Sequence, residues 1–345
     1  KGVMLSHYNV VSNIQQIGQA FALDRDDRIL GILPFFHSFG FTGTLWLPAL
    51  LGSGAVYHPN PVDGRGIGEL VGKYRATFLL ATPTFLQIYI RACTPEQFGS
   101  VEFVLAGAEK LSERLATAFE DRFGLRPMEG YGTTETSPVV TINTRDFRSA
   151  GFRQVGAKRG SIGHPLPGMV ARIVDPDTGA PVALGRAGLL LVKGPNVMQG
   201  YLGQAEKTAE VLRDGWYTTG DIAAMDADGF LAITDRLSRF SKIGGEMVPH
   251  IKVEENLHEL GELTEQTFAV TSVPDERKGE RLVVLYQNLD ESAVQSVVEK
   301  MTATDLPNIW KPRSDQFFKV EALPYLGTGK LDLKQIKTVA AELSP

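Results

Sequence analysis

The sequence contains a single cysteine, Cys93, and this scarcity excludes an intrachain disulfide framework and any zinc site built from several cysteines. It also lacks an excess of positive charge, because 35 Lys and Arg face 40 Asp and Glu for a net charge of −5. We therefore expect no nucleic-acid partner that is bound through bulk positive charge. The composition, 43% hydrophobic and 22% charged, is typical of a globular protein, and the cysteine usage fits a reducing, cytosolic compartment in which Cys93 is a core thiol.

Charged residues are missing altogether between Arg28 and Asp63. Such a stretch could suggest a membrane span, but Pro34, His37 and Pro48 interrupt it and leave no run of about 18 apolar residues. We therefore predict no transmembrane segment in this chain. We interpret the stretch as buried core together with a tunnel for an apolar ligand.

The first half of the chain alternates short apolar runs with helical patterns. The runs at 28–33, 77–81 and 101–106 are nearly all apolar and read as buried strands. Helices are expected after the capping residue Ser6 and at 111–123, where Ser112 is the expected cap. This alternation predicts an α/β fold with a largely parallel sheet between helices.

The texture changes twice further along. Short strands with Asp-Gly and Thr-Gly turns are expected at 170–174, 189–192, 222–225 and 230–233, which predicts an antiparallel subdomain. After Asp235, helices at 251–260 and 292–301 and strands at 266–272 and 281–287 predict a compact α+β module. At 345 residues the chain exceeds one ordinary domain. We expect a large domain at 1–237, α/β at 1–159 and β-rich at 160–237, and a small α+β domain at 238–345.

The strongest local signal is the motif Glu-Gly-Tyr-Gly-Thr-Thr-Glu at 129–135. Small residues let backbone N–H groups approach a phosphate, adjacent threonines add hydroxyl donors, and a final carboxylate can hold a divalent cation. The alternative interpretation is a glycine turn that leads into a helix capped by Thr133.

Three further motifs add to this signal. The run at 216–221 places Asp221 beside a tight turn, where a carboxylate can accept both hydroxyls of a ribose; the alternative is a hairpin entry in which Asp221 caps backbone. Gly107, Ala108 and Glu109 follow a buried strand, the position at which open α/β sheets bind ligands. Near the C-terminus a glycine turn presents Lys330, which by itself could be a solvated charge.

Taken together and in this order, the four motifs resemble those of the adenylate-forming superfamily: acyl-CoA and acyl-carrier-protein synthetases, luciferases and peptide-synthetase adenylation domains. The resemblance covers essentially the whole chain and includes the segments 34–37, 161–168, 194–201 and 235–238. It implies a large, multi-layer α/β adenylation domain with an antiparallel β subdomain, followed by a small mobile C-terminal lid. Residues 1–3 look like the end of the family's phosphate loop, so we expect a fragment that lacks the rest of that loop.

Finer details, at 106–111, 239–248 and 326–330, look most like the synthetase half of the bifunctional 2-acylglycerophosphoethanolamine acyltransferase / acyl-ACP synthetase family. This implies a cytoplasmic enzyme of lysophospholipid reacylation. It leaves open a peripheral association with the inner face of the bacterial plasma membrane through a preceding segment. Ser238 departs from the Asp or Lys that the family usually carries at the hinge.

The resemblance implies two half-reactions that use ATP and Mg²⁺. A fatty-acid carboxylate attacks the α-phosphate of ATP to give acyl-AMP, and the phosphopantetheine thiol of acyl carrier protein then takes the acyl group. A fatty acyl-CoA ligase is the alternative, and a non-catalytic acyl- or nucleotide-binding module is the alternative from another class.

The resemblance also implies roles for individual residues. In the first half-reaction Lys330 bridges the two anions, Glu135 holds Mg²⁺ and His37 gates the acyl tunnel, with a satisfied core histidine as the alternative for His37. In the second, Lys242 and Gly245 approach the pantetheine. The implied nucleotide-binding set consists of Lys1, Gly107, Ala108, Glu109, Glu129, Gly130, Tyr131, Gly132, Thr133, Thr134, Asp221, Ile233 and Arg236.

The residues also bear on the substrate and the acceptor. The run at 35–57 offers no acid to pair with an amino-acid ammonium, whereas an acyl chain gains about 0.8 kcal/mol per buried methylene, so a fatty acid is favoured. A basic run that only Asp146 opposes could dock an acidic carrier or could be a solvated loop. This run comprises Arg145, Arg148, Arg153, Lys158 and Arg159.

Overall fold

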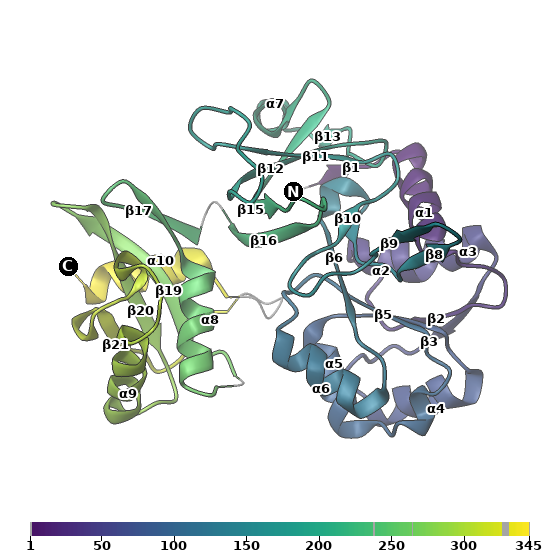
Figure 1. Cartoon of the computed structure of the whole chain (residues 1–345), viewed down its shortest axis with the longest axis horizontal. Coiled ribbons are helices and arrows are strands. Elements are labelled where there is room, and N and C mark those ends of the chain that lie inside the picture. The colour runs from purple at the N-terminus through teal and green to yellow at the C-terminus, as the bar shows by residue number, and fades with distance from the viewer. Residues whose placement is uncertain (1, 237–238, 264, 326–330, 345) are drawn as a thin grey trace. The chain divides into compact units, whose positions relative to one another are not determined.

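The computed structural model describes residues 2–236, 239–263, 265–325 and 331–344, with the backbone alone for Asp235, Arg236 and Met247. It divides into two compact units, residues 1–219 with 223–233 and residues 220–222 with 234–345 (Figure 1). Within the described residues no helix is both long enough and apolar enough to cross a bilayer.

A seven-stranded sheet organises the first unit, in the order β10-β7-β6-β5-β4-β2-β3. The strands β3, β2, β4, β5 and β6 run parallel, and β7 and β10 add antiparallel pairs at one side, which confirms the predicted, largely parallel sheet. Their bounds are β2 (Arg28–Gly31), β3 (Gly54–Tyr57), β4 (Phe78–Ala81), β5 (Phe103–Ala106), β6 (Met128–Gly132), β7 (Val139–Ile142) and β10 (His164–Pro165).

Helices accompany this sheet at the predicted places. The helix α1 (His7–Phe21) begins at Ser6, whose hydroxyl accepts from the Asn9 N–H, and α6 (Glu113–Phe123) begins at Ser112 in the same way. Between the strands lie α4 (Gly64–Tyr74) and α5 (Pro83–Ala92). The sequence rules for helix starts therefore locate these elements correctly.

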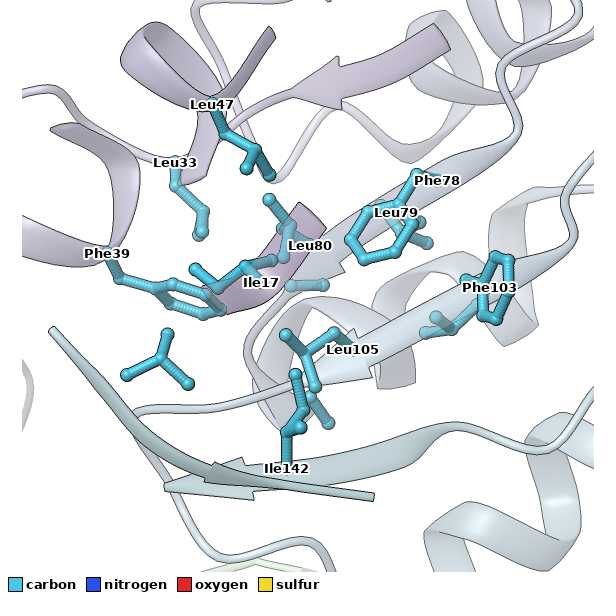
Figure 2. Close-up of a cluster of buried hydrophobic side chains, with 14 of the residues drawn as sticks. Ile17, Leu33, Phe39, Leu47, Phe78, Leu79, Leu80, Phe103, Leu105 and Ile142 are labelled. Carbon is cyan, nitrogen blue, oxygen red and sulfur yellow. The ribbon is translucent and has the colours of Figure 1, made fainter. Parts of the chain in front are cut away.

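The core of the first unit forms around β4 and β5, all of whose residues are buried. Phe21 packs edge-on against Phe78 and Phe103, at centroid distances of 5.0 and 5.1 Å. Figure 2 shows these two strand phenylalanines among leucine and isoleucine side chains from several elements. Each fully buried side chain of this size contributes about 1.5–3 kcal/mol to folding.

The uncharged stretch after Arg28 is only partly core. It contains α2 (Ser38–Gly40), a π-helical turn (Phe41–Trp46) and α3 (Leu47–Leu51). Phe39 and Leu47 are buried, but Phe36 is 93% exposed and Phe35 is 47% exposed. The prediction of a buried stretch thus holds for residues 29–33 but is wrong for residues 34–37, which are exposed just before α2 begins.

A second, mainly antiparallel sheet follows, in the order β11-β12-β15-β14, with β16 also pairing with β15. The tight turn expected beside Asp221 is wrong, because residues 216–221 lie within one ten-residue strand, β15, where Gly220 has a φ of 79°. The bounds are β11 (Val170–Val174), β12 (Gly188–Lys193), β14 (Leu212–Arg213), β15 (Trp216–Met225) and β16 (Leu231–Arg236). Shorter elements are β1 (Val3–Met4), β8 (Phe147–Ser149), β9 (Phe152–Gln154), β13 (Gly200–Tyr201) and α7 (Ala205–Val211).

The second unit is an α+β body with its own core. The sheet β19-β20-β21 alternates its side chains between two apolar clusters, with Leu282 and Val284 in one and Val283 and Leu285 in the other. The first cluster includes residues of α8 and α9, the second residues of α10. The bounds are β17 (Phe240–Ile243), β18 (Glu246–Pro249), α8 (His250–Leu260), β19 (Phe268–Asp275), β20 (Gly279–Tyr286), α9 (Glu291–Thr302), β21 (Phe317–Lys319) and α10 (Leu333–Leu343).

Candidate active site

Two of the predicted ligand-binding motifs lie on neighbouring strands. In the register of β5 and β6, Ala106 stands opposite Glu129, so Gly107, which follows β5, and Gly130, which continues β6, lie at the same edge of the parallel pair. Ala108 adopts a left-handed conformation with a φ of 68°. This edge, at the carboxyl ends of parallel strands, is where open α/β sheets bind their ligands.

The glycine-rich motif is a strand in its first part. Glu129, Gly130, Tyr131 and Gly132 belong to β6, so they extend this strand instead of following it, and only Thr133 onward leaves the sheet; their roles in ligand binding stay predictions. Thr133 caps the 3₁₀ turn at 134–136, and its N–H donates to the Thr136 Oγ1 at 3.1 Å. The alternative interpretation, a helix capped by Thr133, therefore holds for a single turn.

Gly132 is required by the close approach of the next strand. A Cβ atom at this position would lie 2.1 Å from the carbonyl oxygen of Pro138. The register between β6 and β7 shifts between Tyr131 and Gly132, where a bulge accommodates this contact. The turn that carries the threonines thus leaves the sheet at a point where only glycine fits.

Glu135 is held from the segment at 194–201. Its Oε1 accepts a hydrogen bond from the Tyr201 hydroxyl at 2.7 Å, and its carbonyl oxygen accepts from the Met198 N–H at 2.8 Å. The Nδ2 of the fully buried Asn196 donates to the carbonyl of Thr136 at 2.7 Å. A motif 60 residues away thereby fixes the 3₁₀ turn.

Two buried tyrosines accompany this carboxylate. Burial, followed by the hydrogen bond to Glu135, raises the pKa of Tyr201 to about 12. Burial, followed by the charge of Glu135, raises the pKa of Tyr217 as well. Both phenols therefore stay protonated, and the hydroxyl of Tyr201 donates to Glu135. Sequence reasoning quoted both tyrosines inside motifs but assigned them no role, because nothing local marks their direction.

Glu135 is a single carboxylate rather than part of a cage. Across the residues that the structure describes, no group of three or more His, Cys, Asp or Glu could hold a metal ion. Mg²⁺ in nucleotide sites is bound through one or two carboxylates, with phosphates and water as its remaining ligands. A half-buried carboxylate beside two threonines fits that donor set.

The segment that contains His37 reaches the same turn. The Ser38 and Thr134 hydroxyls lie 3.2 Å apart, and the Thr42 hydroxyl donates to the Ser137 carbonyl at 2.9 Å. His37 is exposed, and its Nδ1 accepts from the Phe39 N–H at 3.2 Å. The alternative of a core histidine is therefore wrong, and the role of a gate stays a prediction.

The remaining acids near this edge have structural partners. Glu109 Oε2 accepts from the Thr84 hydroxyl at 2.7 Å, and Glu129 Oε1 accepts from the Leu111 N–H at 3.3 Å. These contacts hold the loop after β5 in place. Neither contact indicates that the carboxylate binds a ligand.

The other predicted site residues belong to other elements or fall outside the described residues. Asp221 is buried in β15, and Ile233, half-buried in β16, packs against the core of the first unit. Lys242 and Gly245 belong to the β17–β18 hairpin of the second unit, and the Lys242 N–H donates to Glu280 at 2.7 Å. Lys1 and Lys330 fall outside the described residues, as does the side chain of Arg236.

The basic run at 145–159 is neutralised from outside. Asp146 accepts from Arg153, as expected, but carboxylates from distant segments pair with other cations of the run. These are Glu102 with Arg145, Asp226 and Asp228 with Lys158, and Glu113 with Arg159. The expectation that only Asp146 opposes this run is therefore wrong.

Comparison with known proteins agrees with this geometry. Residues 1–202 match the family model described as AMP-binding enzyme. A feruloyl-CoA synthase of Amycolatopsis is 34% identical over 96% of this chain and 65% of its own length, and a long-chain-fatty-acid–CoA ligase of Yersinia pestis is 32% identical over 98% and 58%. The chain thus spans about three fifths of the length of such relatives.

Solved structures show the same fold. The ATP-bound MatB from Rhodopseudomonas palustris superimposes with a TM-score of 0.84 at 27% identity, over 100% of this chain and 66% of that one. An o-succinylbenzoate CoA synthetase from Bacillus subtilis, in complex with an acyl-adenylate, also reaches 0.84, at 24% identity. The chain belongs to the AMP-binding enzyme family, within the adenylate-forming acyl-CoA synthetase superfamily.

Proposed function

We propose that this chain is the larger part of an ATP-dependent, AMP-forming acid–thiol ligase that acts on a fatty acid. The observation that carries the proposal is the edge at the carboxyl ends of β5 and β6. There the loop at 107–109 and the threonine turn at 133–136 emerge from neighbouring strands, and Glu135 is held by Tyr201.

The nucleotide would lie along this edge. Gly107, Ala108, Gly130 and Tyr131 would enclose the adenine, while the hydroxyls of Thr133 and Thr134 would donate to phosphate oxygens. Asp221 and Arg236 would hold the ribose above Ile233. Mg²⁺ bound at Glu135 would neutralise phosphate charge, since a hard cation prefers carboxylate oxygen.

The first half-reaction must bring a carboxylate onto a polyanion. The repulsion between two unit charges 4 Å apart is about 1 kcal/mol in water and about 4 kcal/mol at an effective dielectric of 20. Positive charge supplied at the site removes this cost, and Lys330 is the residue that we assign to it. The carboxylate oxygen then bonds to the α-phosphorus as pyrophosphate leaves, which gives acyl-AMP.

The acid is expected to be apolar. No acidic residue occurs between Arg28 and Asp63, so a substrate ammonium would find no partner in this stretch. His37 precedes Ser38, which contacts Thr134, and thus joins the stretch to the threonine turn. A fatty-acid carboxylate could therefore meet the nucleotide with its chain along the uncharged segment.

Coenzyme A is the acceptor that we favour. The relatives named above are called CoA synthases or CoA ligases, and the basic run proposed to dock an acidic carrier is already paired with internal carboxylates. Acyl carrier protein remains the second candidate, on the resemblance of the segments 106–111 and 239–248. In either case Lys242 and Gly245 would approach the pantetheine arm after the second unit turns about Ser238 and withdraws Lys330.

ATP–pyrophosphate exchange in the full natural protein, with fatty acids of several chain lengths, tests the first half-reaction. Lys330→Ala should lower exchange by orders of magnitude yet still transfer the acyl group from supplied acyl-AMP. If Lys330→Ala lowered both steps equally, the proposal that Lys330 serves only the first half-reaction and is then withdrawn would be refuted. Wild-type protein that binds ATP and fatty acid without exchange would instead indicate a binding module.

The acceptor is decided by a competition. Radiolabelled fatty acid is offered with ATP and equal concentrations of coenzyme A and phosphopantetheinylated acyl carrier protein. We expect the label on coenzyme A. A label that accumulates on the carrier alone would overturn this preference and support the acyl-ACP synthetase branch.

A further inference from the structure

The backbone of Tyr201 is fixed at the start of the chain. In the pairing of β1 with β13, Val3 stands opposite Tyr201, and the Leu202 N–H donates to the Gly2 carbonyl at 2.8 Å. Tyr201 is only 2% exposed. The residue therefore has little freedom, and its position depends on the pairing with β1 (Val3–Met4).

The side chain of Tyr201 is aimed at the carboxylate of the threonine turn. Its hydroxyl donates to Glu135 Oε1 at 2.7 Å, while Met198, three residues earlier, donates its N–H to the Glu135 carbonyl at 2.8 Å. One short segment thus holds Glu135 at both its backbone and its side chain.

We propose that Tyr201 is a positioning residue that orients the carboxylate of Glu135 for the metal ion that accompanies ATP. The inference rests on the proposed function, in which Glu135 binds that ion. A glutamate side chain has three rotatable bonds, and a donor on one oxygen restricts the carboxylate before the ion arrives. Loss of a hydrogen-bond donor to a metal-binding carboxylate typically costs about 10–100-fold in metal affinity or activity.

The test removes one oxygen atom. In Tyr201→Phe the ring and its packing remain, and the hydroxyl that donates to Glu135 and also hydrogen-bonds Tyr217 is lost. Tyr89→Phe is the matched control, because Tyr89 is also fully buried and its hydroxyl donates at 2.8 Å to a carbonyl, that of Pro61. Urea unfolding of both variants checks that each is folded.

Metal binding is measured directly, with Mn²⁺ as a spin probe in electron paramagnetic resonance. In the full natural protein, the affinity for Mn²⁺–ATP should fall about tenfold in Tyr201→Phe and stay within twofold in Tyr89→Phe. ATP binding without metal should not change. In exchange assays the Mg²⁺ concentration for half-maximal rate should rise, while the KM for fatty acid is unchanged.

A double-mutant cycle ties the effect to Glu135. In a Glu135→Gln background, which removes the metal-binding charge, Tyr201→Phe should cost little further Mn²⁺–ATP affinity. Unchanged Mn²⁺–ATP affinity in Tyr201→Phe, or additive losses in the cycle, would overturn the inference. If Tyr201→Phe is unfolded, Glu135→Asp, which draws the carboxylate away from the phenol, replaces it, and wild-type affinity in that variant overturns the inference.

The two hypotheses fail differently. Wild-type protein that binds Mn²⁺–ATP but catalyses no exchange removes the proposed function and leaves Tyr201 to be judged by the binding data. Wild-type protein that catalyses exchange while Tyr201→Phe binds Mn²⁺–ATP normally removes the inference alone.

Discussion

Replacing Gly132 by alanine should damage both the stability of the first unit and its site. The added Cβ would lie 2.1 Å from the Pro138 carbonyl oxygen, 2.8 Å from the Pro138 carbonyl carbon and 3.0 Å from the Val139 Cα. All three atoms are backbone, so no side-chain rotation can relieve the contact. The two strands must separate instead.

The magnitude follows from overpacking. Forcing a methyl group into a filled site costs about 1–3 kcal/mol, which for a unit of this size lowers the Tm by roughly 2–12 °C. The Thr133 N–H donates to the same Pro138 carbonyl at 3.0 Å, so a displacement of Pro138 also displaces Thr133. A shift of about 1 Å in a positioned group can cost about 10²-fold in rate. Exchange should therefore fall more than stability alone would explain.

Gly72→Ala is the control, and it is expected to raise the free energy of unfolding where Gly132→Ala lowers it. Gly72 is exposed in α4, and its Cβ would lie 3.6 Å from the nearest atom, in Gln97. Alanine there should stabilise by about 0.5–1 kcal/mol, because it reduces the freedom of the unfolded chain. Urea midpoints and exchange rates are compared for both variants. A Gly132→Ala protein with wild-type midpoint and rate would refute the argument.

The remaining predictions concern buried ionisable groups. Glu254 forms a buried ion pair with Arg239, so Glu254→Ala should cost about 3–5 kcal/mol in urea unfolding, whereas the exposed Glu259→Ala should change little. Burial lowers the pKa of His250 to about 3, below its unfolded value of about 6.5. The contribution of the neutral His250 to the free energy of unfolding is therefore fully present above pH 6.5 and is lost toward pH 3, by about 1.4 kcal/mol per pH unit. His250→Asn should flatten this pH dependence of stability. Burial raises the pKa of Cys93 to about 11, so a thiol reagent at pH 8 should react only after unfolding, and rapid labelling of folded protein would contradict this.

Local rules predicted much of this fold. The caps at Ser6 and Ser112 mark their helices because a side-chain oxygen satisfies a backbone N–H within three residues. The apolar runs that became β4 and β5 could be recognised because strands buried on both faces carry no polar alternation. Each of these signals depends only on neighbours in the sequence.

The site was less predictable because its decisive contacts are distant in sequence. The hydrogen-bonded residues Glu135 and Tyr201 are 66 residues apart in the sequence, and the hydrogen-bonded residues Asn196 and Thr136 are 60 apart. The glycines at 130 and 132 indicated a loop, but they are part of β6, because β6 pairs with a strand on either side. The motif singled out these residues, but strand pairing decided how they are arranged.

The basic run shows the same principle for charge. Four of its five cations pair with five carboxylates, of which only Asp146 lies within the run. Exposed pairs of this kind contribute about 0–1 kcal/mol each, so a partner could displace any of them at little cost. Electrostatic steering of an approaching partner, however, depends on the net electric field beyond about 8 Å at physiological salt. Paired charges of opposite sign largely cancel at that distance, so the net field of this run is weak. Charge on this loop can therefore support short contacts after docking, but it cannot attract an acidic carrier from a distance.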